Sequence, residues 1–152
     1  MDRSETATLP FDCRQLFELV ADIERYPDFL PGWLSARILA REGGQLRVEQ
    51  VLQAGPARLR FRSRAQLQPC SRIHIETLDG PLRGSRIEWR FTALDGGRCQ
   101  LQLHSRLAAS NPLLELPLQW LAGGTGRRLL PLFEQRARRL YGNPQPPDAA
   151  HA

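Results

Sequence analysis

The side chains able to carry acid–base, nucleophilic or metal chemistry are few in this sequence, and they lack the spacings that such chemistry needs. Cys13, Cys70 and Cys99 are odd in number and far apart, which fits neither a metal site nor a disulfide framework. His74 and His104 fall at outward positions of the expected strands, with no second ligand near in sequence. We therefore expect no metal site and no catalytic residue, and we interpret the cysteines as reduced packing residues.

Motifs of the common enzyme classes are also absent from the sequence. It contains no nucleophile elbow, no HExxH, no phosphate-binding glycine loop and no Cys-x-x-Cys. Glu76 and Glu88 fall on outward faces, where a carboxylate has no cause to acquire a catalytic pKa. Asp79 lies in an Asp-Gly-Pro turn, where we expect its side chain to cap its own backbone. The residues thus predict a protein that is not an enzyme.

The more informative chemistry is apolar, and it is concentrated in residues 20–31, which read VADIERYPDFLP. Apolar residues at three- and four-residue spacing just before this point predict a helix over 13–22. A proline disfavours the α conformation in the residue before it, so the helix should break at Pro27. A short turn carrying Phe29 and Leu30 should follow. Such side chains either pack a corner between helix and sheet or line a pocket, and both interpretations stay open.

Length and composition indicate one globular domain. A chain of 152 residues buries roughly 68–70% of its unfolded surface without metals or disulfides. We expect this domain over residues 1–142, followed by a polar, proline-rich and disordered tail over 143–152. No export signal and no stretch of ~20 apolar residues is present, so we predict a cytoplasmic protein, with peripheral contact to the inner membrane left open.

All 21 basic residues are arginine, and the net charge is +5. Arginine presents a planar, permanently charged group that suits phosphates and carboxylates. The positive charge permits an acidic partner but does not require one.

Between Trp33 and Leu107 hydrophobicity alternates with a period of two, which predicts an antiparallel meander. Turn sequences divide it at Gly43-Gly44, Gly55-Pro56, Pro69-Cys70-Ser71, Asp79-Gly80-Pro81 and Asp95-Gly96-Gly97. The expected strands are 34–42, 45–54, 57–68, 72–78, 84–94 and 98–108, with a brief further strand at Glu5–Thr8.

One face of this sheet should be apolar and the other exposed to water. The exposed face carries a stripe of four arginines, Arg58, Arg60, Arg62 and Arg64. They form either an ordinary solvated face or a patch for RNA or anionic lipid. Gln50 falls on the apolar face, where a buried amide needs a partner. A backbone group, a water or a ligand carbonyl would serve.

A helix with interruptions is expected over 113–141, after a capping sequence at Ser110-Asn111-Pro112. Pro117, Pro131 and the glycine cluster at 123–126 interrupt it, and we expect a kink or break near 123–126. A curved sheet that grips such a helix encloses an apolar volume between the two layers.

At this point the sequence resembles a known family. The string at residues 20–31, with ARIL at 36–39 after it, resembles the coenzyme Q-binding START-like family, which includes the bacterial ribosome-association toxin. That family belongs to the wider polyketide cyclase/dehydrase and lipid transport superfamily. Further matches follow in the same order: FRSR at 61–64, LDGPLR at 78–83, WRF at 89–91 and RARRLYG at 136–142. The resemblance extends over about residues 5–142.

The resemblance implies an α+β helix-grip fold (START-like, Bet v 1-like), with a curved seven-stranded antiparallel sheet wrapped around a long C-terminal helix. It also implies a hydrophobic tunnel that binds ubiquinone or a similar isoprenoid lipid, without a required cofactor or a catalytic step, in support of respiratory quinone function. The candidate ligand-binding residues are Tyr26, Phe29, Leu30, Trp33, Gln50, Leu52, Phe61, Ser63, Trp89, Phe91, Leu103, Trp120 and Phe133. Gly32 stands where the family commonly has an aromatic residue, and Trp33 follows it. If ligand preference differs from that of the family, it should differ there.

Two alternative functions stay open. The first is a ribosome-associated toxin or regulator that binds the large ribosomal subunit through the arginine stripe. The second is a polyketide cyclase/dehydrase-like enzyme acting on a bound aromatic, which would need an ionisable group inside the tunnel.

Overall fold

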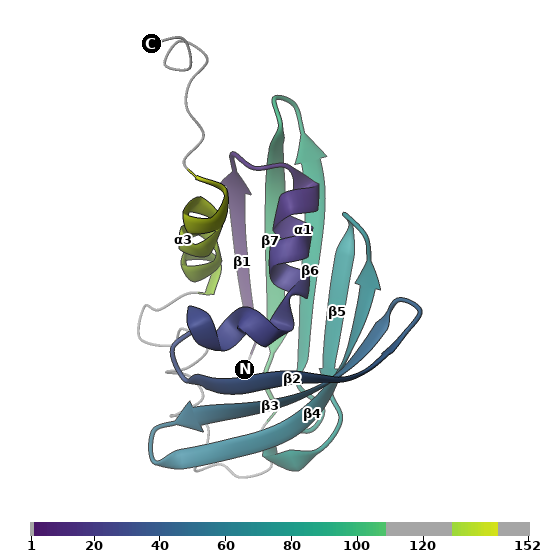
Figure 1. Ribbon diagram of the computed structural model, residues 1–152, viewed down its shortest axis with the longest axis vertical. Coiled ribbons are helices and arrows are strands. Elements are labelled where there is room, and N and C mark those ends of the chain that lie inside the picture. Colours follow the sequence, from purple (N-terminus) through teal and green to yellow (C-terminus); the bar gives the residue numbers. More distant parts are fainter. Residues whose placement is uncertain (1, 109–128, 143–152) are drawn as a thin grey trace.

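The computed structural model describes residues 2–108 and 129–142 of the chain. Seven antiparallel strands form one curved sheet with helices on one face (Figure 1). The strands are β1 (Asp2–Leu9), β2 (Trp33–Glu42), β3 (Gln45–Ala54), β4 (Ala57–Gln68), β5 (Arg72–Thr77), β6 (Arg86–Leu94) and β7 (Arg98–Arg106). Their order is β1-β7-β6-β5-β4-β3-β2, a meander whose first strand pairs with its last. The expected meander is confirmed, and β1 is longer than the brief strand that we predicted.

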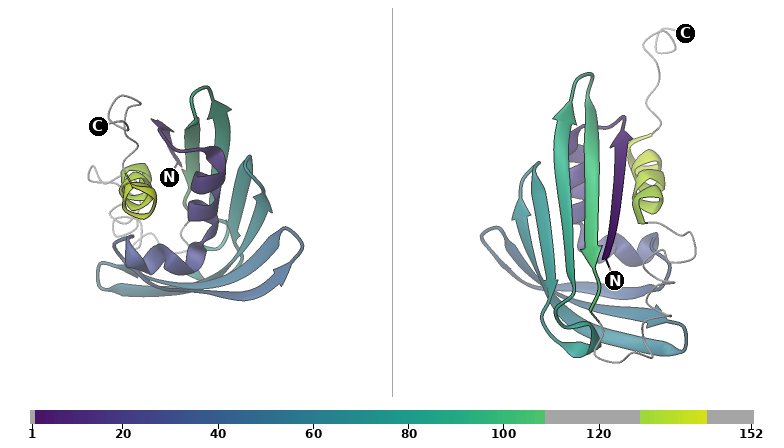
Figure 2. Two further views of the ribbon diagram at one scale, coloured as in Figure 1. Left: turned by 45° about the horizontal axis from the view of Figure 1, so that its top comes forward. Right: turned by 180° about the vertical axis from the view of Figure 1, so that it is seen from behind.

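Helices α1 (Cys13–Ala21), η1 (Ile23–Asp28) and α3 (Leu129–Tyr141) lie on the concave side of the sheet, and a short turn of helix, η2 (Gly80–Leu82), follows β5. The left view in Figure 2 shows β2, β3 and β4 bending beneath η1, while β6, β7 and β1 rise beside α1. The fold is therefore the helix-grip fold. None of the helices in the described part of the chain is long and apolar enough to cross a membrane.

The break after α1 corrects one prediction. The chain leaves the α conformation at Asp22, whose ψ is 67°, and not at Pro27. Pro27 instead lies inside the 3₁₀ helix η1. A proline cannot donate a backbone hydrogen bond, so the residues after it must close this part of the chain. Phe29 and Leu30 then close this turn, because both of their N–H groups bond to the Tyr26 carbonyl.

The turn after β5 corrects a second prediction. The Asp79 carboxylate does not cap its own backbone but accepts the N–H of Arg62 in β4, at 2.7 Å. Gly80 has a φ of +77°, and a Cβ at this position would lie 2.8 Å from the Arg60 carbonyl oxygen. Only glycine permits that approach, so the Asp-Gly pair fastens the turn against β4.

The C-terminal helix is described from Leu129 onward. We expected Pro131 to interrupt the helix, but α3 runs through it. Pro131 falls in the first turn of α3, where a missing N–H breaks no helical bond. The predicted break at 123–126 and the tail over 143–152 lie outside the described residues.

Phe133 of α3 lies at the centre of the main core cluster. Its ring is 4.7 Å from that of Trp89, 5.1 Å from that of Phe29 and 5.5 Å from that of Tyr26, all in edge-to-face geometry. A second and smaller cluster holds Leu52, Leu59, Phe61 and Leu82, and Trp33 packs against both clusters. The core is therefore divided in two.

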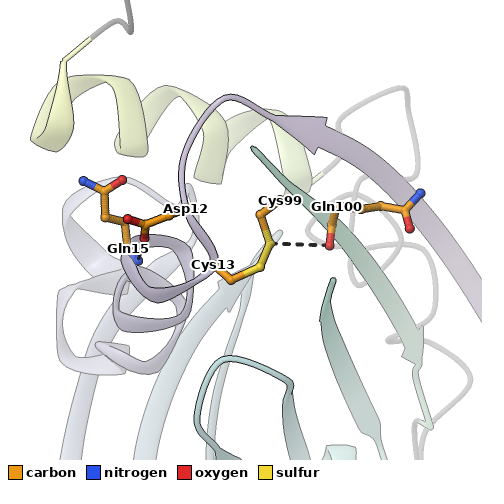
Figure 3. The surroundings of a disulfide bond; sticks show 5 residues. All are labelled: Asp12, Cys13, Gln15, Cys99 and Gln100. Carbon is orange, nitrogen blue, oxygen red and sulfur yellow. Dashed lines mark hydrogen bonds between the residues drawn. A yellow bond between two sulfur atoms is a disulfide. The ribbon is translucent and has the colours of Figure 1, made fainter. Parts of the chain in front are cut away.

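A disulfide joins Cys13 at the start of α1 to Cys99 in β7 (Figure 3). Our prediction that all three cysteines are reduced is thus wrong for this pair. Their separation of 86 residues gave no signal in sequence. Pairing of β1 with β7 places Leu9 opposite Cys99, and the turn into α1 brings Cys13 to the same place, with a Cα–Cα distance of 5.3 Å. Cys70 is free and exposed.

Candidate functional site

A cavity of about 80 Å³ lies between the two core clusters. The main cluster contributes Tyr26, Ile75 and Leu129 to the cavity wall, and the smaller cluster contributes Leu52, Phe61 and Leu82. The sheet supplies most of the wall, η1 supplies Tyr26, and the first residue of α3 covers part of it. The helix and the sheet thus enclose an apolar space, which is the arrangement that we expected from a curved sheet gripping a helix.

Six of the predicted ligand-binding residues lie on this cavity: Tyr26, Trp33, Gln50, Leu52, Phe61 and Ser63. Six others are packed in the main core cluster or against it and are not part of the cavity wall: Phe29, Leu30, Trp89, Phe91, Leu103 and Phe133. Trp120 lies outside the described residues. A contact between any of these residues and a ligand stays a prediction.

Gln50 is 6% exposed and projects from β3 into the cavity wall. Its side-chain oxygen accepts a hydrogen bond of 2.8 Å from the indole Nε1 of Trp33, in the neighbouring strand β2. The partner of this buried amide is thus an aromatic side chain, which was not among the partners that we considered. The bond fixes both side chains and leaves the Gln50 amide group at the cavity.

Three further hydroxyl side chains line the cavity and were missed in the sequence: Thr77, Ser85 and Ser105. Thr77 follows Ile73 and Ile75 at inward positions of β5, so strict use of the alternation would have found it. Ser105 follows Leu101 and Leu103 in the same way in β7. Ser85 is already satisfied, because its Oγ bonds to both the N–H and the carbonyl of Ala108.

Tyr26 is the one titratable side chain on the cavity wall within the described residues. Its hydroxyl donates a hydrogen bond to the carbonyl of Val20 in α1. Burial raises the pKa of Tyr26 well above its ordinary value, and the nearby Asp22 carboxylate raises it further. The group therefore stays neutral near physiological pH and is held by the backbone.

Helix α3 is fastened over the cavity by two polar contacts that the sequence did not reveal. Glu5 in β1 is 6% exposed, and its carboxylate oxygens accept the N–H groups of Leu129 and Leu130 at 3.3 and 3.2 Å. A carboxylate at this end of a helix also meets the positive end of the helix dipole. Farther along α3, Arg136 lies over the Phe29 ring at 5.4 Å and 3.8 Å from Asp28 Oδ2.

The predicted arginine stripe lies on the opposite face of the sheet. Arg60, Arg62 and Arg64 each have a carboxylate within 4.0 Å, from Glu49, Asp79 and Glu76 respectively. Arg58 makes no such pair within the described part of the chain. These pairs are largely exposed and contribute little to stability.

A second pocket of about 270 Å³ opens beside this stripe. Arg47 and Arg62 border it together with Asp79, Leu39, Leu78 and Ser63. Two guanidinium groups against one carboxylate leave the pocket with positive charge, which suits an anion.

His74 lies beside a group of charged side chains on the outer face of the sheet. Glu88 in β6 lies between Arg72 and Arg90 and 3.8 Å from His74 Nδ1. Burial acts to raise the pKa of Glu88, but hydrogen bonds from Arg90 and Arg72 outweigh it and lower the pKa overall. Among the residues that the structure describes, no three His, Cys, Asp or Glu side chains are grouped so as to hold a metal ion.

Comparison with known proteins gives matches over most of the chain. The sequence model of the family described as "Polyketide cyclase / dehydrase and lipid transport" matches residues 9–134. The "Ribosome association toxin RatA" of Pseudomonas aeruginosa is 32% identical over 137 residues, which cover 90% of this chain and 95% of that protein. The mitochondrial "Coenzyme Q-binding protein COQ10 homolog B" of Xenopus laevis is 26% identical, over 100% of this chain and 64% of that protein.

Solved structures share the fold. The Zhui aromatase/cyclase from Streptomyces sp. R1128 superposes with a TM-score of 0.78, at 21% identity, over 92% of this chain and 95% of that one. At this identity the likeness concerns the fold alone.

Proposed function

Since the chain belongs to the polyketide cyclase / dehydrase and lipid transport family, we propose that it binds a hydrophobic small molecule in its cavity and carries it without changing it chemically. The observation that supports this most directly is the cavity itself. Its wall is almost entirely apolar, it separates two core clusters, and a small number of neutral polar groups face it. Such a site favours binding through the removal of apolar surface from water, at roughly 25 cal/mol per Å².

The ligand that we propose is ubiquinone or a similar isoprenoid with a neutral ring. The coenzyme Q-binding relative, which is 26% identical over the whole of this chain, supports a quinone. At about 80 Å³ the cavity is smaller than the roughly 300–1,000 Å³ of most sites for drug-sized ligands. It therefore accommodates at most the ring end of such a molecule. The isoprenoid tail would leave the cavity, or η1 and α3 would move to make room.

Binding without catalysis is the simpler reading of the described wall. A cyclase needs an acid or base that changes protonation near its working pH. Tyr26 cannot supply one, because burial raises its pKa and its proton is bonded to the Val20 carbonyl.

The test is to purify the protein without detergent and to analyse an organic extract by mass spectrometry. We expect a neutral isoprenoid or quinone in amounts well above those in a parallel purification of an unrelated protein. In a second measurement, a short-chain ubiquinone is titrated into ¹⁵N-labelled protein, and the indole N–H signals are followed by NMR. The Trp33 signal should shift at the lowest ligand concentrations, because that indole lies on the cavity wall. An empty extract together with an unchanged Trp33 signal would rule out this function.

A second candidate function is association with the large ribosomal subunit. It is favoured by the RatA relatives, at 32% identity over most of both chains, and by the arginine stripe with the neighbouring positive pocket. Binding of RNA phosphates by arginine would weaken steeply with salt, by roughly 0.7–0.9 log units per contact for each tenfold rise in salt.

Sedimentation of lysates through sucrose gradients tests the second candidate. If it is right, the protein travels with the large subunit at low salt and is released progressively as salt rises. Failure to travel with ribosomal particles at any salt concentration would exclude it, while leaving the cavity proposal untouched.

A further inference from the structure

Ser63 carries the least explained polar group in the described part of the molecule. Ser63 lies at an inward position of β4 and is 1% exposed. Its Oγ has no hydrogen-bond partner among the described residues. More than nine in ten buried polar groups in proteins are hydrogen-bonded, so an orphan hydroxyl calls for a reason. Ser63 borders both the apolar cavity and the positive pocket beside the arginine stripe. Because it is buried at an inward position of β4, we assign its hydroxyl to the wall of the apolar cavity.

Ser63 and two neighbouring polar side chains form a polar strip on an otherwise apolar cavity wall. Thr77 in β5 is its direct partner in the β4–β5 register, and both residues are buried on the same face. Directly opposite residues of an antiparallel pair hold their Cβ atoms roughly 4.5–5.5 Å apart. Gln50, fixed by Trp33, borders the same cavity from β3. Three adjacent strands thus present neutral hydrogen-bonding groups to one side of one cavity.

The charges of the wall residues restrict the ligand further. Within the described residues, the cavity wall contains no arginine, histidine, aspartate or glutamate. A charged ligand group would lose its hydration there without gaining a counter-ion, which is strongly unfavourable. A neutral oxygen, by contrast, would receive the proton of a hydroxyl that is otherwise unsatisfied.

We infer that Ser63 is a specificity-determining residue, whose hydroxyl donates a hydrogen bond to a neutral oxygen, a ring carbonyl or ether, on the bound ligand. Thr77 and Gln50 flank that contact. The ligand class is then a neutral oxygenated ring, as opposed to a pure hydrocarbon or a fatty-acid anion. This inference rests on the proposed function and deepens it. Ser63 does not act as a nucleophile, since no base adjoins it on the described wall.

The experiment compares duroquinone with durene, an aromatic hydrocarbon that carries the same four methyl groups on a six-membered carbon ring but has no carbonyl oxygen. Decanoate serves as a third, anionic probe. Each is titrated into the full chain, and the dissociation constant is taken from the Trp33 indole signal. Wild-type protein should bind duroquinone more tightly than durene. In Ser63→Ala that ratio should fall by about tenfold, equivalent to about 1.4 kcal/mol, while the affinity for durene is unchanged.

Ser71→Ala is the matched control, because it makes the same substitution at an exposed turn residue that does not line the cavity. The ratio should not change in this variant. The free Ser63→Ala protein should also be at least as stable as wild type towards urea, because the lost hydroxyl had no partner. That result separates ligand recognition from a structural role.

The outcomes are distinguishable. If both probes bind and Ser63→Ala leaves their ratio unchanged, the inference is overturned and the proposed function stands. If decanoate binds as tightly as duroquinone, the assignment of a neutral ligand class is wrong. If neither ring probe binds, the proposed function fails and the inference fails with it.

Discussion

Tyr26 connects the cavity to the helices that cover it. Its ring meets Phe133 of α3 and Trp33 of β2, and its hydroxyl is bonded to the last turn of α1 through Val20. A single side chain thereby joins η1, α1, α3 and the sheet at one corner of the cavity. The pKa of Tyr26 reports on this packing, because ionisation would place a charge in the core.

Alkaline titration should expose that role. Burial raises the folded-state pKa of Tyr26 above its ordinary value of 10.0. Its contribution to stability is therefore complete below pH 10 and is lost as the pH rises further, because the unfolded chain then ionises and the folded one does not. Each such group lowers the unfolding free energy by up to about 1.4 kcal/mol per pH unit. The chain has no lysine and only two tyrosines, so few other groups titrate in this range.

Tyr26→Phe should remove this slope and also cost about 1–2 kcal/mol at pH 7, because the Val20 carbonyl loses its donor. Urea unfolding at pH 7, 9, 10.5 and 11.5 measures both effects. Tyr141→Phe is the control: burial also raises the pKa of Tyr141, but this residue is only partly buried, so its slope should be shallower. Equal alkaline slopes for wild type and Tyr26→Phe would contradict the prediction.

At the scale of elements, the strands followed from hydrophobic alternation and turn sequences, since both act locally. Thr77 and Ser105 were missed although the same local alternation places them inward, whereas other missed features depend on contacts between distant parts of the chain. In the sequence Glu5 looks like an ordinary strand residue, because its role depends on the contact between β1 and the distant helix α3. Cys13 and Cys99 become neighbours only when β1 pairs with β7. For the cavity, alternation placed Gln50 and Ser63 on the apolar face, but no sequence pattern separated cavity wall from packed core for Trp89 or Phe91.

Glu5 should determine how firmly α3 is attached to the sheet. Glu5→Ala leaves two buried N–H groups of Leu129 and Leu130 without their acceptor, and we expect a loss of about 2–3 kcal/mol. Glu5→Gln keeps one acceptor oxygen and should lose less. Hydrogen exchange measured by mass spectrometry should show faster exchange in peptides over 129–141. The exposed control Glu42→Ala should leave that region protected, and equal exchange in Glu5→Ala and Glu42→Ala would contradict the role of Glu5.

Helix α1 is attached to the sheet covalently, because the disulfide holds the start of α1 against β7 (Figure 3). A link closing a loop of this length constrains the unfolded chain by roughly 4–5 kcal/mol in the chain-entropy description. Cys13→Ala combined with Cys99→Ala should lower the urea midpoint accordingly, whereas Cys70→Ala should not. Alkylation of denatured protein, followed by mass spectrometry, should modify one thiol without reductant and three with it. Three modified thiols without reductant would show that the bond does not form.

The whole molecule presents two unlike surfaces on the two sides of one sheet. The helices lie on the concave side of the sheet (Figure 2), together with the core and the apolar cavity. The convex side holds the arginine stripe and its acidic partners. The two candidate functions divide along the same line, because one uses the cavity and the other uses the outer face. A strand has side chains on both faces, so substitutions in the same element can address each surface separately.

This division predicts that the two activities can be removed independently. Ser105→Leu adds apolar volume at an inward position on the cavity and should abolish binding of duroquinone with little effect on stability. Replacing Arg58, Arg60 and Arg62 by glutamine removes three charges from the outer face and should leave duroquinone binding unchanged. If the protein associates with ribosomes, the triple arginine variant should sediment free at a lower salt concentration than wild type, and Ser105→Leu should sediment as wild type does. A control with the same kind of charge change on the helices, Arg14→Gln with Arg139→Gln, should alter neither activity. Loss of both activities in Ser105→Leu, with an unchanged urea midpoint, would mean instead that ligand binding and association with ribosomes are coupled through the sheet.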